Sequence, residues 1–89
     1  MFDAMREAVL KYAQEHIDKT DNVTLTLDDV YIVWSCKALQ NWKALISTTL
    51  SDGMYYECTY NGGTNQLYLD AYKKWENVTI DNFRELLQD

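Results

Sequence analysis

The side chains that could carry out covalent chemistry are few. The chain has one histidine, His16, and two cysteines, Cys36 and Cys58. A catalytic thiol needs a neighbouring base that a third group orients. His16 lies far from both cysteines in the sequence and in a different predicted element. We therefore expect no catalytic cysteine, and we expect both thiols to be reduced and buried as small apolar groups.

Metal and phosphate sites have equally little support. Asp28 and Asp29 are adjacent acids, but no histidine, cysteine or third acid stands at ligand spacing from them. Neither C-x-x-C nor H-E-x-x-H occurs, and Gly62-Gly63 has no following helix that would complete a phosphate loop. Fourteen acidic residues allow carboxylate chemistry in principle, although a sequence cannot show two of them converging. The sequence predicts no enzyme, no metal and no cofactor.

The element that must position these side chains is the stretch from residue 30 to residue 72. Apolar residues alternate along it with the period of two that a half-buried strand needs, which predicts four antiparallel strands in a meander. The expected core-facing sets are Val30, Ile32, Trp34, Cys36 and Ala38; Trp42, Ala44, Ile46, Thr48 and Leu50; Met54, Tyr56, Cys58 and Tyr60; and Leu67, Leu69 and Ala71. Trp34 and Trp42 are the expected core anchors. Cys36 and Cys58 would then lie two strand spacings apart, about 9–10 Å, which is too far for a disulfide.

A helix is expected at each end of this sheet. From Asp3 to about Asp18, apolar residues recur every three to four positions: Phe2, Met5, Val9, Tyr12, Ala13, His16 and Ile17. A second helix over Ile80–Leu87 would follow an N-cap at Thr79. The predicted fold class is α+β, with one domain over residues 1–89: a four-stranded antiparallel meander sheet flanked by an N-terminal and a C-terminal helix.

Three local details of this fold can be read from the sequence. Thr26 to Asp29 matches a capping box, so Leu27–Leu39 could instead form a helix, although the β-branched and aromatic run after Asp29 favours a strand. A three-residue loop, Ser51–Gly53, would pair Ile46 with Cys58 and put Gly53 at positive φ. The hairpin at residues 61–65 accepts a loop of two or of four residues.

Composition argues against a nucleic-acid-binding, secreted or membrane-spanning protein. A net charge of −6 argues against direct nucleic-acid binding, which needs a basic surface. Residues 1–19 carry several charges and form no signal peptide, and no run approaches the roughly 18 apolar residues of a membrane span. We expect a cytoplasmic protein with no membrane partner.

The second face of the predicted sheet is unusually aromatic. The candidate interface or ligand residues on it are Tyr31, Val33, Leu45, Tyr55, Tyr68 and Tyr72. Three explanations stay open: a helix covers this face within the monomer, the face pairs with a second copy, or it holds a ligand or a foreign protein. Tyrosine is enriched at interfaces because it joins apolar area to a polar tip. We expect a homodimer.

Three segments, DVYIVWSCKALQNWKAL, STTLSDGMYYECTYNGG and YLDAYKKWENV, carry a family resemblance. From roughly Tyr12 to Ile80 the chain resembles a family of small uncharacterised proteins encoded by phages and prophages of Gram-positive (Firmicutes) bacteria. The resemblance implies a setting, a phage or prophage product inside a bacterial cell, and no activity or functional residue. Two functions are open: a non-enzymatic accessory protein that binds a host protein or small molecule, for instance to counter a host defence, or a structural or assembly component of the phage particle.

Overall fold

The computed structural model describes residues 1–17 and 24–87. Its elements are α1 (Phe2–His16), the 3-10 turn η2 (Leu27–Asp29), β1 (Val30–Ala38), β2 (Asn41–Thr48), β3 (Met54–Asn61), β4 (Gln66–Lys73) and the 3-10 turn η3 (Phe83–Leu86). The strands form one sheet in the order β1-β2-β3-β4 with every pair antiparallel. The predicted meander and N-terminal helix are therefore confirmed. The predicted end of the helix near Asp18 lies outside the described residues.

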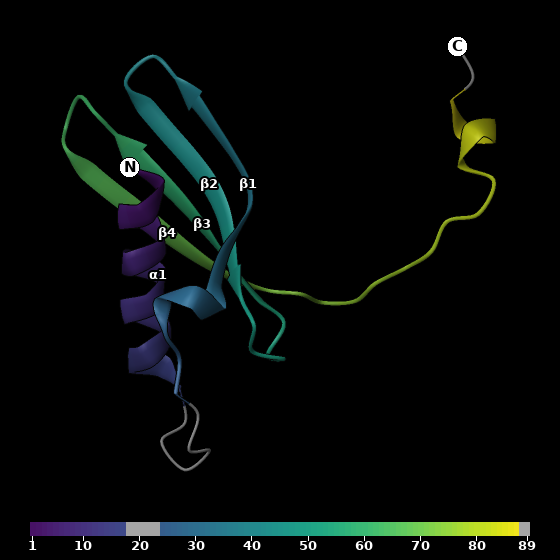
Figure 1. The fold of residues 1–89 in the computed structure, drawn as a ribbon. Helices are drawn as coiled ribbons and strands as arrows, with labels where there is room; N and C mark the ends of the chain where they lie inside the picture. The colour runs from purple at the N-terminus through teal and green to yellow at the C-terminus, as the bar shows by residue number, and fades with distance from the viewer. Residues whose placement is uncertain (18–23, 88–89) are drawn as a thin grey trace.

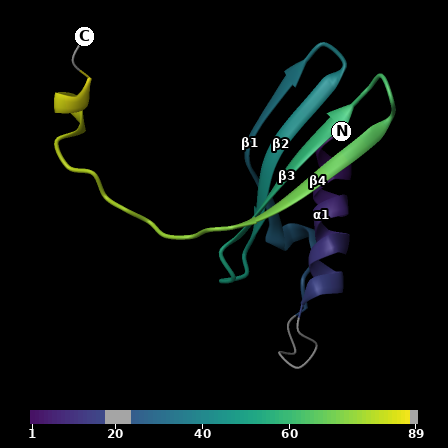
Figure 2. The ribbon, with the colours of Figure 1, turned by 180° about the vertical axis from the view of Figure 1, so that it is seen from behind.

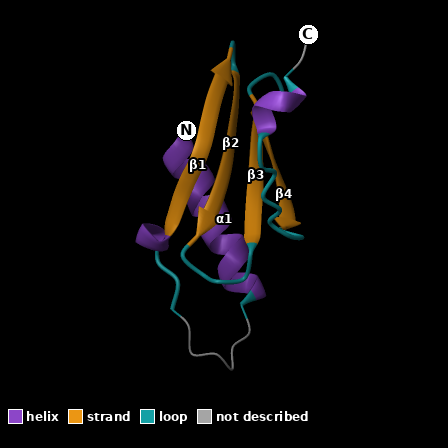
Figure 3. Ribbon diagram, turned by 90° about the vertical axis from the view of Figure 1, so that its right-hand side faces the viewer, coloured by secondary structure: helices purple, strands orange, loops and turns teal. Residues whose placement is uncertain are grey.

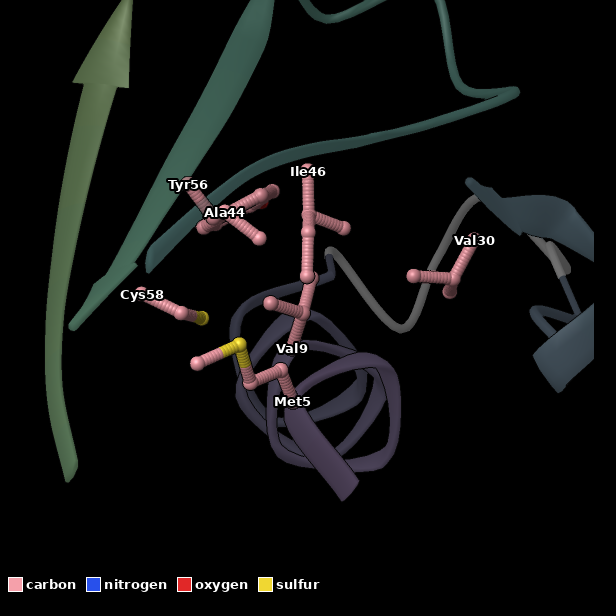
Figure 4. Close-up of a cluster of buried hydrophobic side chains, with 7 residues drawn as sticks. All are labelled: Met5, Val9, Val30, Ala44, Ile46, Tyr56 and Cys58. Carbon is pink, nitrogen blue, oxygen red and sulfur yellow. The ribbon is translucent and has the colours of Figure 1, made fainter. Parts of the chain in front are cut away.

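One face of the sheet is packed against α1. The apolar stripe of the helix buries Met5, Val9 and Ala13, and Figure 4 shows Met5 and Val9 directed toward Cys58 and Ile46 of the sheet. Figures 1 and 2 show that α1 lies on one side of the sheet only. The core is thus a single layer of side chains between one helix and one sheet face.

Arg6 ties α1 to the start of β1. Its Nε donates a hydrogen bond to the Val30 carbonyl oxygen at 2.9 Å, and an Nη donates to the Leu27 carbonyl at 2.8 Å. These two bonds orient the helix across the junction between η2 and the sheet. The capping signal at Thr26 is real, because the Thr26 backbone N–H donates to Asp29 Oδ2 at 2.9 Å. It closes only the single turn η2, so the alternative helix over Leu27–Leu39 is wrong.

The second hairpin differs from its prediction by two residues. Ile46 lies opposite Tyr56 instead of Cys58, because the connection between Thr48 and Met54 holds five residues instead of three. Gly53 has the predicted positive φ, at 70°. A shift of two residues keeps the side-chain parity, so the core faces of β2 and β3 still coincide. The sequence allowed a loop of either two or four residues at the third connection. The structure has the four-residue loop, residues 62–65.

A β-bulge in β1 changes which of its side chains reach the core. Ile32 lies opposite Ile46, but Trp34 lies opposite Leu45, so Val33 is an extra residue in the strand. An extra residue reverses the faces of every position beyond it. Trp34 and Cys36, predicted to be in the core, therefore point to the face away from α1. Trp34 is 44% exposed and Cys36 is exposed, so both predictions are wrong.

The predicted C-terminal helix over Ile80–Leu87 is also wrong. Residues 74–87, here called the C-terminal arm, leave β4 as an extended chain and contain only η3 (Figure 1). Asn82 has the left-handed φ of 56°, which breaks the helix two residues after it would begin. A helix of eight residues is not stable alone without a surface to pack on. Every described residue of the arm is exposed.

Candidate functional site

The sheet face turned away from α1 collects the predicted interface residues. Strand registers align three rows across the sheet: Tyr31, Ser47, Tyr55 and Tyr72; then Trp34, Leu45, Glu57 and Asp70; then Cys36, Lys43, Thr59 and Tyr68. We call these twelve residues, with Val33 of the bulge, the tyrosine face. All six predicted residues belong to it, and Figure 3 shows this side of the sheet with α1 behind it.

The apolar side chains of the tyrosine face are partly exposed. The exposed fractions are 47% for Tyr31, 46% for Val33, 44% for Trp34, 50% for Tyr68 and 53% for Tyr72. Leu45 and Tyr55 belong to the two central strands, and their side chains are half-buried. The face therefore presents partly exposed aromatic and aliphatic side chains on a hydrogen-bonded platform, with Lys43, Glu57 and Asp70 among them. Exposed apolar side chains gathered on one face are typical of an interaction surface.

Trp34 and Cys36 are the members of the face that sequence reasoning missed. The bulge at Val33 brings them there, and no glycine marks the bulge in the sequence. Leu39, the apolar residue that follows β1, lies outside the face, in the turn between β1 and β2, at 92% exposure. Its φ of 56° is in the left-handed region.

One ion pair crosses the middle of the tyrosine face. Lys43 Nζ lies 3.0 Å from Glu57 Oε1, and the hydrogen bond to Glu57 raises the pKa of Lys43, with a further electrostatic contribution from the same carboxylate. The pair neutralises both charges where the apolar residues meet. Asp70 adds a carboxylate at the edge strand, in the same row as Glu57.

The reactive groups stay apart. His16 is on α1, and its Nδ1 lies 2.7 Å from the Tyr12 carbonyl oxygen. Cys58 is fully buried on the α1 side, where burial raises the pKa of its thiol to about 11, with a smaller contribution from the Asp70 charge. Cys36 is exposed on the tyrosine face. The structure thus places His16, Cys36 and Cys58 on separate parts of the described chain, with Cys36 opposite Lys43 on the tyrosine face.

In the described part of the chain no helix is long and apolar enough to cross a membrane.

Comparison with known proteins identifies a family but no function. No curated protein and no solved structure matches the chain. A family of unknown function, DUF6275, matches residues 2–82, which include α1, the whole sheet and residues 74–82 of the arm. The chain therefore belongs to the family of unknown function DUF6275.

Proposed function

We propose that this protein is a non-enzymatic accessory protein of a phage or prophage that acts inside a bacterial cell by binding proteins, and that the tyrosine face is its binding surface. The observation that carries the proposal is that this face gathers partly exposed aromatic and aliphatic side chains and that the described helical segments leave it uncovered. Interface cores are enriched in tyrosine and tryptophan and depleted of charge. The two charges in the centre of the face, Lys43 and Glu57, are paired with each other, which lowers the cost of removing them from water.

The first partner on this surface is a second copy of the chain. An 89-residue chain with one layer of core has limited internal stabilisation, and association is a common supplement. Two-fold pairing uses the same surface on both copies and closes without leaving an apolar edge. The homodimer thereby keeps the tyrosine face out of water until a target is present.

The second partner is a host protein that takes the place of the second copy. A face that spans four strands suits a protein better than a small molecule, because small ligands bind in concave sites that bury most of their surface. Binding a host protein in this way is the means by which a phage product would counter a host defence.

Sedimentation equilibrium at micromolar concentration tests the proposal. The wild-type chain should sediment as a dimer of the 10.5 kDa protomer. Tyr72→Asp and Tyr55→Asp should shift it toward monomer, because each places a charge in the apolar interface. Leu39→Asn is the matched control: it also removes an exposed apolar side chain, but from a turn outside the face. A monomeric wild type, or a dimer that both tyrosine variants leave intact, would contradict the proposal.

Capture from bacterial lysate then addresses the host partner. Wild type and Tyr72→Asp are used as paired baits, and a host protein retained only by the wild type is purified and titrated against the dimer. The proposal expects this protein to dissociate the dimer. A host protein that binds both baits equally would use another surface and would contradict the assignment to the tyrosine face.

A second candidate function, a structural or assembly component of the phage particle, is favoured by one observation. The C-terminal arm projects from the sheet with exposed apolar side chains, and arms of this kind can link neighbouring subunits. Head-to-tail linkage that does not close produces open assemblies, whereas reciprocal linkage produces a dimer. Species larger than a dimer that grow with concentration would favour the assembly role.

A further inference from the structure

The C-terminal arm carries a second apolar surface that its own chain does not cover. Its exposed apolar residues are Trp75 (94%), Val78 (64%), Ile80 (61%), Phe83 (53%), Leu86 (67%) and Leu87 (62%). Ile80, Phe83, Leu86 and Leu87 follow the spacing of one face of a helix. The arm thus holds a helix-type stripe that has not formed a helix.

The arm projects on the same side of the sheet as the tyrosine face. Figures 1 and 2 show it leaving the end of β4 on the side opposite α1 and standing away from the sheet. Its first residue, Lys74, still extends the ladder, because its N–H donates to the Gly53 carbonyl oxygen at 2.7 Å. The direction of the arm is therefore set by β4.

The backbone of the arm does not favour a return to its own sheet. Residues 74–87 contain no glycine and no proline, and among them only Asn82 has a positive φ. A return to the tyrosine face of the same copy would need a reversal close to Lys74, where the chain is extended. A copy that faces this one presents its tyrosine face in the direction in which the arm already runs.

The arm is long enough to cross that facing sheet. An extended chain covers roughly 3.3 Å per residue, so the six residues 74–79 span about 20 Å. Four strands spaced about 4.8 Å apart make a sheet about 15 Å wide between the outer strands. This stretch is therefore long enough to bring residue 80 to any strand of the facing sheet, so that residues 80–87 can pack on the tyrosine face of the second copy.

We propose that two copies exchange their C-terminal arms, each arm docking on the tyrosine face of the other copy, where residues 80–87 complete a helix. This inference rests on the proposed function, because it uses the same face for self-association. The helix would bury Ile80, Phe83 and Leu87 on the second face, as α1 buries Met5, Val9 and Ala13 on the first. Each sheet would then lie between two helices, which is a stable layer arrangement for an antiparallel sheet.

Full-length point variants separate the arm from the face. Phe83→Asp alters the arm, and because every described arm residue is exposed, this change leaves the core of the protomer intact. Tyr72→Asp alters the face, and Leu39→Asn is the control. Sedimentation equilibrium should show at least a tenfold higher dimer dissociation constant for the arm variant and for the face variant, with no change for the control. Circular dichroism at low concentration checks that each variant keeps its sheet.

Mixing the two defective variants gives the sharpest test. Phe83→Asp has an intact face, and Tyr72→Asp has an intact arm, so a mixed dimer contains one complete arm–face contact while neither homodimer contains any. The mixture should form heterodimers, with an affinity between those of the wild type and of the separate variants. Two sheets that paired face to face without arms would show no such restoration.

The outcomes distinguish this inference from the proposed function. If Phe83→Asp dimerises like the wild type while Tyr72→Asp does not, the face pairs directly, and arm exchange is wrong although the proposed function stands. If the mixture forms no heterodimer, or if the arm of a monomer docks on its own face, arm exchange is also wrong. If neither variant changes the dimer, both proposals are wrong. A second arm variant, Trp75→Ala, should weaken the dimer in the same direction as Phe83→Asp.

Discussion

Trp34 lies directly opposite Leu45, whereas Ile32, two residues earlier in the same strand, lies opposite Ile46. The single extra residue between them, Val33, moves a tryptophan from the helix-covered face of the sheet to the open one. It also gives the open face its largest side chain, on the same edge strand as Tyr31. The composition of the candidate interface thus depends on one local irregularity in β1.

The two tryptophans of the sheet should respond differently to truncation. Trp42 is half-buried, its ring meets the Phe2 ring edge-on at 5.1 Å, and Lys37 Nζ lies 4.5 Å from its centroid. Trp42→Ala should lower the free energy of unfolding by about 2–4 kcal/mol. Trp34→Ala should cost the protomer about 1 kcal/mol or less, because the side chain is on the open face. Urea denaturation at low protein concentration measures both values, and equal costs would contradict the bulge.

Much of the sheet could be predicted because side-chain parity is a strong signal. In β2, β3 and β4 one face packs on α1, so apolar residues such as Ile46 and Tyr56 repeat with a period of two. The error of two residues in the second hairpin left this parity unchanged. The six predicted residues of the tyrosine face were found for the same reason, since they occupy the alternate positions.

The missed features have physical causes that pattern reasoning does not detect. Val33 is a β-branched residue in an unbroken β-rich run, so nothing in its type reveals a bulge, and the faces of Trp34 and Cys36 were therefore inverted. The stripe from Ile80 to Leu87 is genuine, but a stripe shows only that a segment can pack, and not what it packs on. In the described protomer the arm is packed on no surface, and the helix is absent.

Arg6 should stabilise the junction between α1 and the sheet. Arg6→Ala removes the two hydrogen bonds to the carbonyl oxygens of Leu27 and Val30, and we expect a loss of about 1.5–3 kcal/mol. Arg6→Lys keeps the charge but reaches one carbonyl at a time, so it should recover only part of the loss. Lys11→Ala, on the exposed side of α1, is the control and should stay within about 0.5 kcal/mol. Equal stability of all three variants in urea denaturation would show that the junction does not depend on Arg6.

Gly63 should tolerate replacement by alanine, whereas its neighbour Gly62 should not. A Cβ on Gly62 would lie 2.5 Å from the Gln40 carbonyl oxygen, a backbone atom that cannot move without shifting the first hairpin. On Gly63 the nearest atoms are side-chain atoms, the Asn61 Oδ1 at 3.3 Å and the Gln40 Nε2 at 3.4 Å. Gly62→Ala should cost about 1–3 kcal/mol, and Gly63→Ala about 0.5 kcal/mol or less. Thermal melts of the pair measure the difference, and a reversed order would be inconsistent with this contact between the turns.

The two thiols should differ in reactivity. Cys36 is exposed on the tyrosine face, while Cys58 is fully buried with its pKa raised by burial to about 11. An aromatic disulfide reagent at pH 8 should modify one thiol of the native monomer quickly and the second only after denaturant is added, because the reactive form is the thiolate. Cys36→Ser should abolish the fast phase. If the tyrosine face is the dimer interface, the fast phase should also slow as the protein concentration rises, and a rate that does not depend on concentration would place Cys36 outside the interface.

The Cys58 thiol should also make stability depend on alkaline pH. In the unfolded chain the thiol has its ordinary pKa of 9.0, and in the folded protein its pKa is about 11. Between these values the unfolded state has released a proton that the folded state keeps, so the free energy of unfolding falls as the pH rises from 9 to 11. Burial raises the pKa of Tyr56 as well, so the free energy of unfolding should fall further above pH 10. Cys58→Ala removes the first contribution and leaves the second, so its stability should decline less steeply from pH 9 to 10 than that of the wild type. Parallel curves for the two proteins, measured by urea denaturation across this range, would show that the Cys58 thiol ionises equally readily in the folded and unfolded states.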